Sequence, residues 1–263
     1  MGQRIITGIV AGAAFIGLLV AGGWYYACLL FLLALIGYWE FVRLNGQPWK
    51  RLDVLVGFAA TGLIALPKLP FDWELPSFTA IVWILMFVLL SGTVFSKNRI
   101  QLEHVGVLFL GAVYVGAGFH YMAVTRELEH GIFWSALTFA CIWASDAGAY
   151  FVGKAIGRTK LWPSISPNKT IEGALGGLVI AVIVGLIFAF FEPEWVGYGR
   201  AALIGLTAAV AGQLGDLVQS AYKRFRGVKD SGRLLPGHGG VLDRMDSWLI
   251  VFPFVHLIGL LAG

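Results

Sequence analysis

Long apolar segments constrain this chain more than any other feature of its sequence. Most of them approach the length of about 20 residues that a helix needs to cross a bilayer. Hydrophobic residues make up 58% of the chain and charged residues only 13%, whereas soluble domains carry about 25% charged residues. We therefore expect an all-α polytopic membrane protein with about nine transmembrane helices. The segments are roughly 4–21, 24–41, 53–67, 77–95, 105–124, 132–152, 174–191, 199–220 and 247–262.

The basic residues predict the orientation of these segments. If the N-terminus lies in the cytoplasm, all of the 19 Lys and Arg residues except Lys68, Arg126 and Arg200 fall on the cytoplasmic side. Membrane proteins concentrate Lys and Arg in cytoplasmic loops, so we predict a cytoplasmic N-terminus and an external C-terminus. The same rule accounts for the net charge of +4 without a nucleic-acid partner.

Two cytoplasmic loops, 153–173 and 221–246, are far more polar than the other connections. Chemistry at the cytoplasmic face of the membrane is expected there. The sequence therefore predicts two regions: 1–131, a set of N-terminal transmembrane helices, and 132–263, a C-terminal transmembrane region that carries the polar motifs.

The end of the eighth apolar segment places polar side chains on one helical face. Gln213, Asp216, Ser220 and Lys223 follow i, i+3 and i+4 spacing. A carboxylate inside an apolar helix costs about 2.5–3.5 kcal/mol on insertion scales, so Asp216 needs a cation, a partner or water. A hydrogen bond to a neighbouring helix would satisfy it, but we favour a metal ligand that faces a wet cavity.

A glycine-rich turn follows this segment. Residues 235–240 read Leu-Pro-Gly-His-Gly-Gly, and glycines allow backbone N–H groups to approach an anion closely. A plain turn between helices is the alternative interpretation. The basic residues around the turn favour phosphate binding; they are Lys223, Arg224, Lys229 and His238.

Two aspartates follow the turn. Asp243 and Asp246 are three residues apart, so on a helix they are neighbours. Both could bind one metal ion, or Asp246 could pair with Arg244 or Lys223.

The loop after the sixth apolar segment carries a second polar motif. Asp146 lies near the cytoplasmic end of that segment, and Ser166-Pro-Asn-Lys-Thr170 follows. Lys169 and Thr170 offer a cation and a hydroxyl group to a phosphate. For Asp146 we favour an electrostatic supporting role, with contact to a metal or a nucleotide as alternatives.

These motifs resemble those of a known enzyme family. The pattern S-x-x-K-R-x4-K-D-x-G-x2-L-P-x-H-G-G-x2-D-R-x-D, which starts at Ser220, resembles the signature of phosphatidate cytidylyltransferases. Tyr222 departs from it, because the family usually has an aliphatic residue or Phe there. The pair D-A-G-A-Y and S-P-N-K-T-I-E-G in the earlier loop is also similar. The resemblance covers about 140–263, and the first five segments match only in hydropathy.

The resemblance implies an enzyme of phospholipid biosynthesis in the cell (inner) membrane. It would convert CTP and phosphatidate into CDP-diacylglycerol and pyrophosphate, with Mg²⁺ bound by Asp216 and Asp243, a K⁺ ion beside it, and a homodimeric assembly. We add Asp246 to the predicted metal ligands, and Lys223 and Lys169 to the catalytic residues. The predicted substrate-binding residues are Asp146, Ser166, Thr170, Ser220, Arg224, Lys229, His238, Gly239, Gly240 and Arg244.

Two other functions remain open at this stage. A CTP-dependent polyprenol or lipid kinase shares substrates and topology but would transfer the γ-phosphate of CTP. A transporter would also place charges in broken helices, although it has no need of a long basic loop beside two carboxylates.

Overall fold

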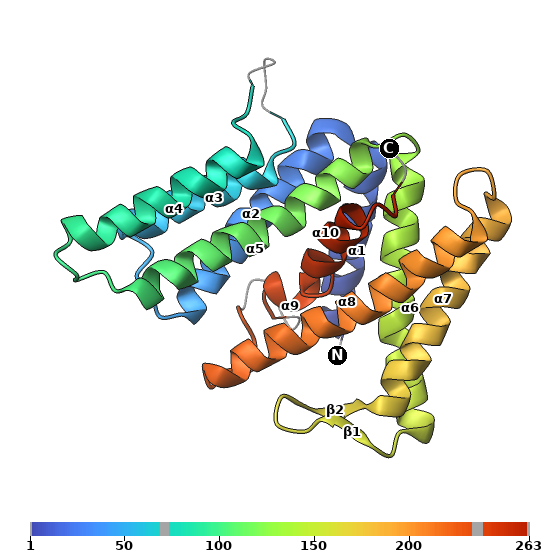
Figure 1. The fold of residues 1–263 in the computed structure, drawn as a ribbon. Coiled ribbons are helices and arrows are strands. Elements are labelled where there is room, and N and C mark those ends of the chain that lie inside the picture. Colours follow the sequence, from blue (N-terminus) through green and yellow to red (C-terminus); the bar gives the residue numbers. More distant parts are fainter. Residues whose placement is uncertain (1, 69–73, 233–238, 262–263) are drawn as a thin grey trace. The chain divides into compact units, whose positions relative to one another are not determined.

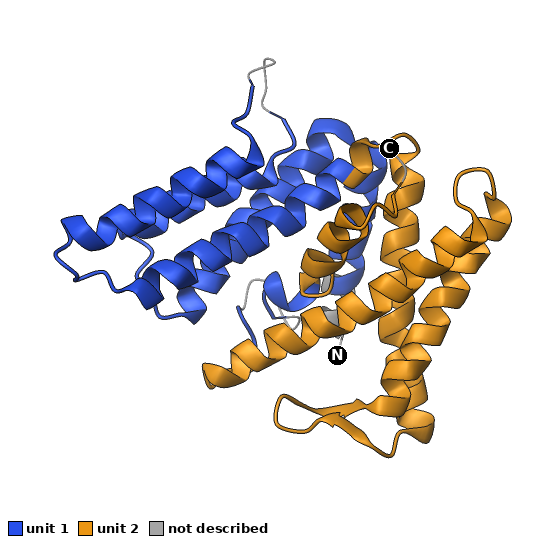
Figure 2. Cartoon of the chain, in the orientation of Figure 1, with its two compact units in different colours: residues 1–124, 230–244 blue, residues 125–229, 245–263 orange. Residues whose placement is uncertain are grey.

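The structure, a computed structural model, describes residues 2–68, 74–232 and 239–261, and the side chains from residue 8 onward within them. Its elements are α-helices apart from one short two-stranded hairpin (Figure 1). The chain forms two compact units (Figure 2). Unit 1 comprises residues 1–124 and 230–244, and unit 2 comprises residues 125–229 and 245–263.

Unit 1 is built from the N-terminal helices and a short helix of the 230–244 segment. Tyr38, Val54, Leu85 and Leu108, all less than 3% exposed, lie in its core. Glycine allows a close approach at Gly57, where a Cβ atom would collide with the Tyr38 ring. The helices are α1 (Gly2–Ala21), α2 (Gly23–Leu44), α3 (Leu52–Ala65), α4 (Phe78–Phe95), α5 (Leu102–Glu127) and α9 (Leu242–Met245). Helices α5 and α9 each end just inside unit 2.

Unit 2 is a bundle whose helices pack through small residues. A Cβ atom at Gly177 would meet the Ser145 carbonyl oxygen, and one at Gly205 would meet that of Ala181. Small residues are typical of helix interfaces in membranes because they let backbones approach closely. The elements are α6 (Gly131–Ile156), β1 (Lys160–Trp162), β2 (Ser166–Thr170), α7 (Ile171–Phe191), α8 (Tyr198–Phe225) and α10 (Trp248–Leu257).

The described helices confirm an all-α polytopic membrane protein. Six of them, α2, α4, α5, α6, α7 and α8, are long and apolar enough to cross a bilayer. Three further apolar stretches coincide with other predicted segments: residues Gly8–Ala21 of α1, α3 (Leu52–Ala65) and α10 (Trp248–Leu257). The number of nine spans is therefore not confirmed and stays a prediction.

Two features of unit 2 differ from the expected helices and loops. Residues 160–170, expected as a loop, form an antiparallel hairpin in which Lys160 pairs with Thr170 and Trp162 with Ser166. The hairpin extends from the ends of α6 and α7 (Figure 1). Helix α8 continues to Phe225, beyond the predicted end at 220, so Lys223 and Arg224 lie on its last turn. The predicted division at 131 and 132 rested on motif positions and stays a prediction.

Candidate functional site

A charged cavity in unit 2 is the best candidate for a functional site. Its volume is about 410 Å³. Carboxylates from two helices, Asp146 of α6 and Asp216 of α8, line it together with Lys169 of β2. Most of the other lining residues come from the same elements: Ala149, Tyr150, Gly153, Lys154, Leu161, Asn168, Thr170, Ala174 and Gln213.

Asp216 is held by two side chains. The Lys169 Nζ atom lies 2.5 Å from its Oδ2 atom, and the Ser220 hydroxyl donates a hydrogen bond of 3.2 Å to its Oδ1 atom. The Asp216 side chain is 33% exposed and that of Lys169 28% exposed, so both are accessible from the cavity. The i, i+4 relation of Asp216 and Ser220 on α8 is the one that the sequence predicts.

The hairpin brings Lys169 to this place because both of its ends are fixed. Thr170 is the N-cap of α7, and its hydroxyl accepts a hydrogen bond of 3.1 Å from the Gly173 N–H. The Glu172 carboxylate accepts hydrogen bonds of 3.1 Å from the N–H groups of Arg158 and Thr159. These bonds fix the chain before β1 and after β2, so Lys169 is presented to Asp216 from a short, braced segment.

Gln213 braces the helices behind the cavity. Its Nε2 atom donates to the Ser145 hydroxyl at 3.3 Å and to the Ala174 carbonyl oxygen at 3.1 Å. One side chain of α8 therefore contacts both α6 and α7 beside the cavity.

Asp246 lies in the same unit, between α9 and α10. The pKa of its carboxyl group is raised to about 7, chiefly by burial and then by the neighbouring carboxylates of Asp216 and Asp146, against the opposing effects of the Ser247 N–H and Lys223. The Ser247 N–H donates a hydrogen bond of 2.9 Å to the Asp246 Oδ1 atom. Three carboxylates of unit 2 thus repel one another, which is an arrangement that a cation would relieve.

Asp243 belongs to unit 1 and has a different environment. Its Oδ2 atom accepts hydrogen bonds from the backbone N–H groups of Ser231, at 2.8 Å, and Gly240, at 2.9 Å. Gly239 has φ +83°, and a Cβ atom there would lie 2.7 Å from that oxygen. Gly239 of the predicted turn therefore lets the backbone pass close to the Asp243 carboxylate.

Glu40 is a polar residue that the sequence analysis missed. It lies on α2 with 0% exposure, and its carboxylate accepts hydrogen bonds from the Ser231 hydroxyl and the N–H groups of Val241 and Leu242. A signal was present, because Glu40 is the one charged residue in the apolar segment 24–41. Like Asp216, Glu40 is a carboxylate inside an apolar helix and needs a cation, a partner or water.

The structure gathers only part of the predicted site. Asp146, Thr170, Lys169 and Asp216 line one cavity, and Arg224 reaches the Ile165 carbonyl oxygen at the hairpin turn, at 3.4 Å. Within the described ranges, no three His, Cys, Asp or Glu side chains lie close enough together to hold a metal ion. Lys229 and Arg244 are exposed on units 2 and 1, respectively. His238 lies outside the described residues.

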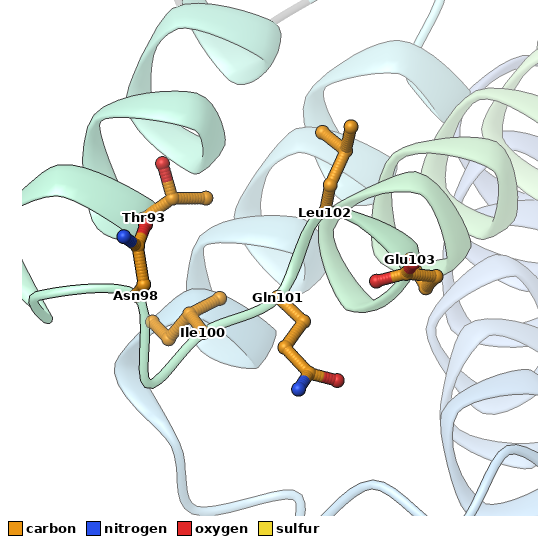
Figure 3. A pocket seen from close by; sticks show the side chains of 6 residues that line it. All are labelled: Thr93, Asn98, Ile100, Gln101, Leu102 and Glu103. Atoms are coloured by element: carbon orange, nitrogen blue, oxygen red, sulfur yellow. The ribbon is translucent and has the colours of Figure 1, made fainter.

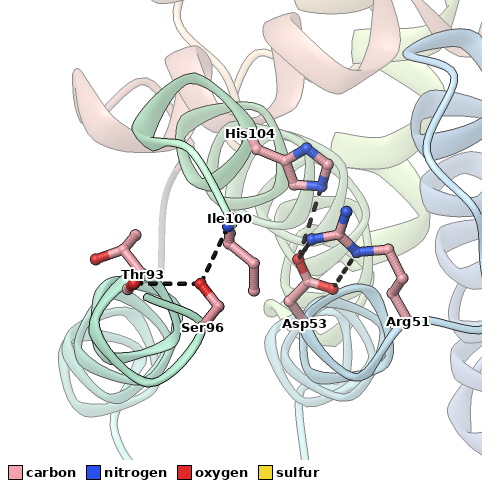
Figure 4. Close-up of polar contacts among 6 residues, drawn as sticks. All are labelled: Arg51, Asp53, Thr93, Ser96, Ile100 and His104. Carbon is pink, nitrogen blue, oxygen red and sulfur yellow. Dashed lines mark hydrogen bonds and ion pairs between the residues drawn. The ribbon is translucent and has the colours of Figure 1, made fainter. Parts of the chain in front are cut away.

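Two other polar features, both in unit 1, lack this combination of charges. A cavity of about 520 Å³ beside the α4–α5 connection (Figure 3) contains Glu103 as its one charged lining residue among Thr93, Asn98, Ile100, Gln101 and Leu102. At the start of α3, Arg51 forms two hydrogen bonds with Asp53, at 3.0 and 2.7 Å, and the His104 Nε2 atom lies 3.6 Å from the Asp53 Oδ2 atom (Figure 4). This cluster compensates its own charges.

Comparisons with known proteins give a consistent result. The model of the cytidylyltransferase family matches residues 2–261. A phosphatidate cytidylyltransferase of Bacillus subtilis (strain 168) is 40% identical over 261 residues, which are 98% of this chain and 97% of the relative. Those of Staphylococcus haemolyticus (strain JCSC1435) and Staphylococcus epidermidis (strain ATCC 12228 / FDA PCI 1200) are 39% and 38% identical, and each alignment covers 98% of both chains.

Proposed function

This chain belongs to the cytidylyltransferase family, and from that premise we propose that it transfers the cytidylyl group of CTP to phosphatidate. The products would be CDP-diacylglycerol and pyrophosphate. Relatives with this activity in their names align over nearly the whole chain. The structural observation that carries the proposal is the cavity of unit 2, where Lys169 and Asp216 meet at 2.5 Å. A cation and a carboxylate in one accessible cavity suit phosphate groups and the metal ions that accompany them.

The proposed chemistry asks for charge neutralisation rather than a strong base. The nucleophile is a phosphate monoester whose second pKa is about 6, so it is largely dianionic at neutral pH. Its oxygen attacks the α-phosphorus of CTP. The bond between this phosphorus and the oxygen that bridges it to the β-phosphate breaks, which releases pyrophosphate. Lys169, with Lys154 in the same lining, would offset the repulsion between the two anions. Preorganised charges of this kind stabilise charge that develops in a transition state.

We also propose a magnesium site, with K⁺ beside it as the family implies. Asp216, Asp243 and Asp246 are the proposed ligands, and carboxylate oxygens are the donors that Mg²⁺ prefers. The mutual repulsion of the Asp146, Asp216 and Asp246 carboxylates in unit 2 supports a cation there. When bound, Mg²⁺ would neutralise phosphate oxygens of CTP and of the departing pyrophosphate.

Labelled CTP tests the reaction type directly. With phosphatidate and Mg²⁺ present, label in the α-phosphate should enter a lipid product, and label in the γ-phosphate should leave as pyrophosphate. Diacylglycerol should be inert because it has no phosphate nucleophile. Entry of γ-label into lipid with release of CDP would replace the proposal with a lipid kinase. Movement of neither label with any lipid phosphate would favour a transporter.

The proposed setting is the cell membrane, with a cytoplasmic N-terminus, an external C-terminus and a homodimeric assembly. Charge asymmetry of the loops supports this orientation. Single cysteines at Lys160 and Glu129, introduced after replacement of Cys28 and Cys141, test it with an impermeant reagent on intact cells. Position 129 should react and position 160 should not; the opposite pattern would reverse the orientation.

A further inference from the structure

Glu40 is buried in unit 1, where residues 231–232 and 240–242 of the 230–244 segment approach α2. Its side chain has 0% exposure. The backbone of the segment comes so close that a Cβ atom at Gly232 or at Gly240 would collide with the Glu40 carboxylate. An ionised carboxylate in such a place is tolerated only where hydrogen-bond donors surround it.

The donors come from both ends of the segment. The Ser231 hydroxyl donates to Glu40 Oε2 at 3.0 Å, and the Leu242 N–H donates to the same oxygen at 2.9 Å. The Val241 N–H donates to Oε1 at 3.0 Å. Glu40 therefore ties residue 231 to residues 241 and 242, across ten positions of the chain that carry the glycine-rich turn.

The same backbone also holds Asp243. Ser231 donates its hydroxyl to Glu40 and its N–H to Asp243. The Val241 N–H donates to Glu40, and the N–H of its neighbour Gly240 donates to Asp243. The two carboxylates therefore share one scaffold, and the position of the Asp243 donors depends on where Glu40 holds their neighbours.

We infer that Glu40 is a positioning residue for the proposed reaction, which fixes the backbone donors that orient Asp243 for Mg²⁺. This inference rests on the proposed function. Glu40 acts through Ser231, Val241 and Leu242. Groups that orient metal ligands in this way typically change metal affinity or activity by about 10–100-fold when they are removed.

Hydrogen exchange of the purified full-length protein without ligands tests the scaffold independently of activity. Glu40→Gln keeps the shape but replaces one acceptor oxygen with an NH₂ group, which cannot accept from Val241 or Leu242. The N–H groups of Gly240, Val241 and Leu242 should then exchange about tenfold faster or more. Thr61→Val is the matched control, because it removes a buried hydrogen bond of 2.7 Å to the Gly57 carbonyl oxygen in the same unit. It should leave these amides unchanged.

A magnesium titration of turnover tests the consequence for Asp243. Glu40→Gln should need about tenfold more Mg²⁺ for its half-maximal rate, while the KM for phosphatidate changes less than about twofold. Glu40→Asp retains the charge and should fall between this variant and the wild type. If Glu40→Gln does not fold, Ser231→Ala, which removes one donor to Glu40, should shift both measurements in the same direction by about threefold.

The two experiments separate the possible failures. Unchanged exchange at residues 240–242 in Glu40→Gln would overturn the inference. A magnesium requirement in Glu40→Gln equal to that of the wild type would overturn it as well, even if the maximal rate were lower. If the wild-type protein transfers no cytidylyl group, the proposed function fails, and with it the role of Glu40 in that reaction. The exchange result then still decides whether Glu40 holds the backbone around Asp243.

Discussion

Asp216 in unit 2 and Asp243 in unit 1 have the same predicted role but opposite surroundings. Asp243 accepts hydrogen bonds from two backbone N–H groups, whose neighbours are fixed by the buried Glu40. Asp216 is 33% exposed and its partners are the side chains of Lys169 and Ser220. Backbone N–H groups are among the partners of Asp243, whereas Asp216 is held by side chains that can rotate away.

The difference teaches how the two aspartates would respond to a ligand. Backbone donors keep their place without further ordering, so the Asp243 carboxylate would already be oriented when a metal ion binds. Lys169 has a long, flexible side chain and compensates the Asp216 charge. We expect Lys169 to pair with phosphate oxygens of CTP instead of Asp216, whose carboxylate would then be available to hold a metal ion.

The largest expected effect is that of removing either carboxylate. Asp216→Asn and Asp243→Asn should each abolish nearly all cytidylyl transfer, because the amide keeps the shape but lacks the charge that binds Mg²⁺. Turnover of purified, folded variants measures this. Glu194→Gln in unit 2 and Glu103→Gln in unit 1, both exposed, are the controls and should remain active. Activity above about a tenth in either aspartate variant corresponds to less than about 1.4 kcal/mol, which is too little for a metal ligand.

A smaller effect is expected for the cation of the Asp216 pair. Lys169→Ala should slow turnover about 10–100-fold, because it removes a charge that offsets the repulsion between the two phosphate substrates. Lys160→Ala is the matched control, since Lys160 lies exposed on the partner strand of the same hairpin; its rate should change less than about twofold.

The magnesium requirement of Lys169→Ala sharpens the comparison between the two aspartates. Lys169 competes with a metal ion for Asp216, so its loss should leave the magnesium concentration at half-maximal rate unchanged or lower. Disruption of the Asp243 scaffold through Glu40→Gln should raise it. A raised magnesium requirement in Lys169→Ala would show that the Lys169–Asp216 ion pair supports the metal site. The contrast between the exchangeable partners of Asp216 and the fixed partners of Asp243 would then fail.

Features that depend on local periodicity could be predicted from the sequence. Each described helix of ten or more residues overlaps one of the nine apolar segments, because hydropathy over about 20 residues suffices to identify a membrane helix. The contact between Asp216 and Ser220 follows from i, i+4 spacing on α8. The number of spans is not confirmed, because α3 and α10 have only 14 and 10 residues and a helix needs about 20 to cross a bilayer.

Features that depend on distant segments could not be predicted. The hairpin at 160–170 has only three and five residues in its strands, and its ends are held by Glu172 and Thr170 rather than by a strand pattern. The donors of Glu40 lie 191 to 202 positions away in the chain. The sequence marks Glu40 as an unusual residue in an apolar segment, but only the folded chain identifies its partners.

The smallest expected effect concerns the second side chain that holds Asp216. Ser220→Ala removes a hydrogen bond of 3.2 Å to the Asp216 Oδ1 atom. In this partly exposed place the loss is about 1 kcal/mol, or about fivefold in turnover. Ser220→Thr keeps a hydroxyl group and should retain most of the rate, because an alcohol on α8 can still reach Asp216. A loss in Ser220→Ala as large as that in Asp216→Asn would mean that the hydroxyl contacts substrate directly. Ser220 would then act on the substrate rather than through Asp216, and the contrast between the partners of Asp216 and those of Asp243 would fail.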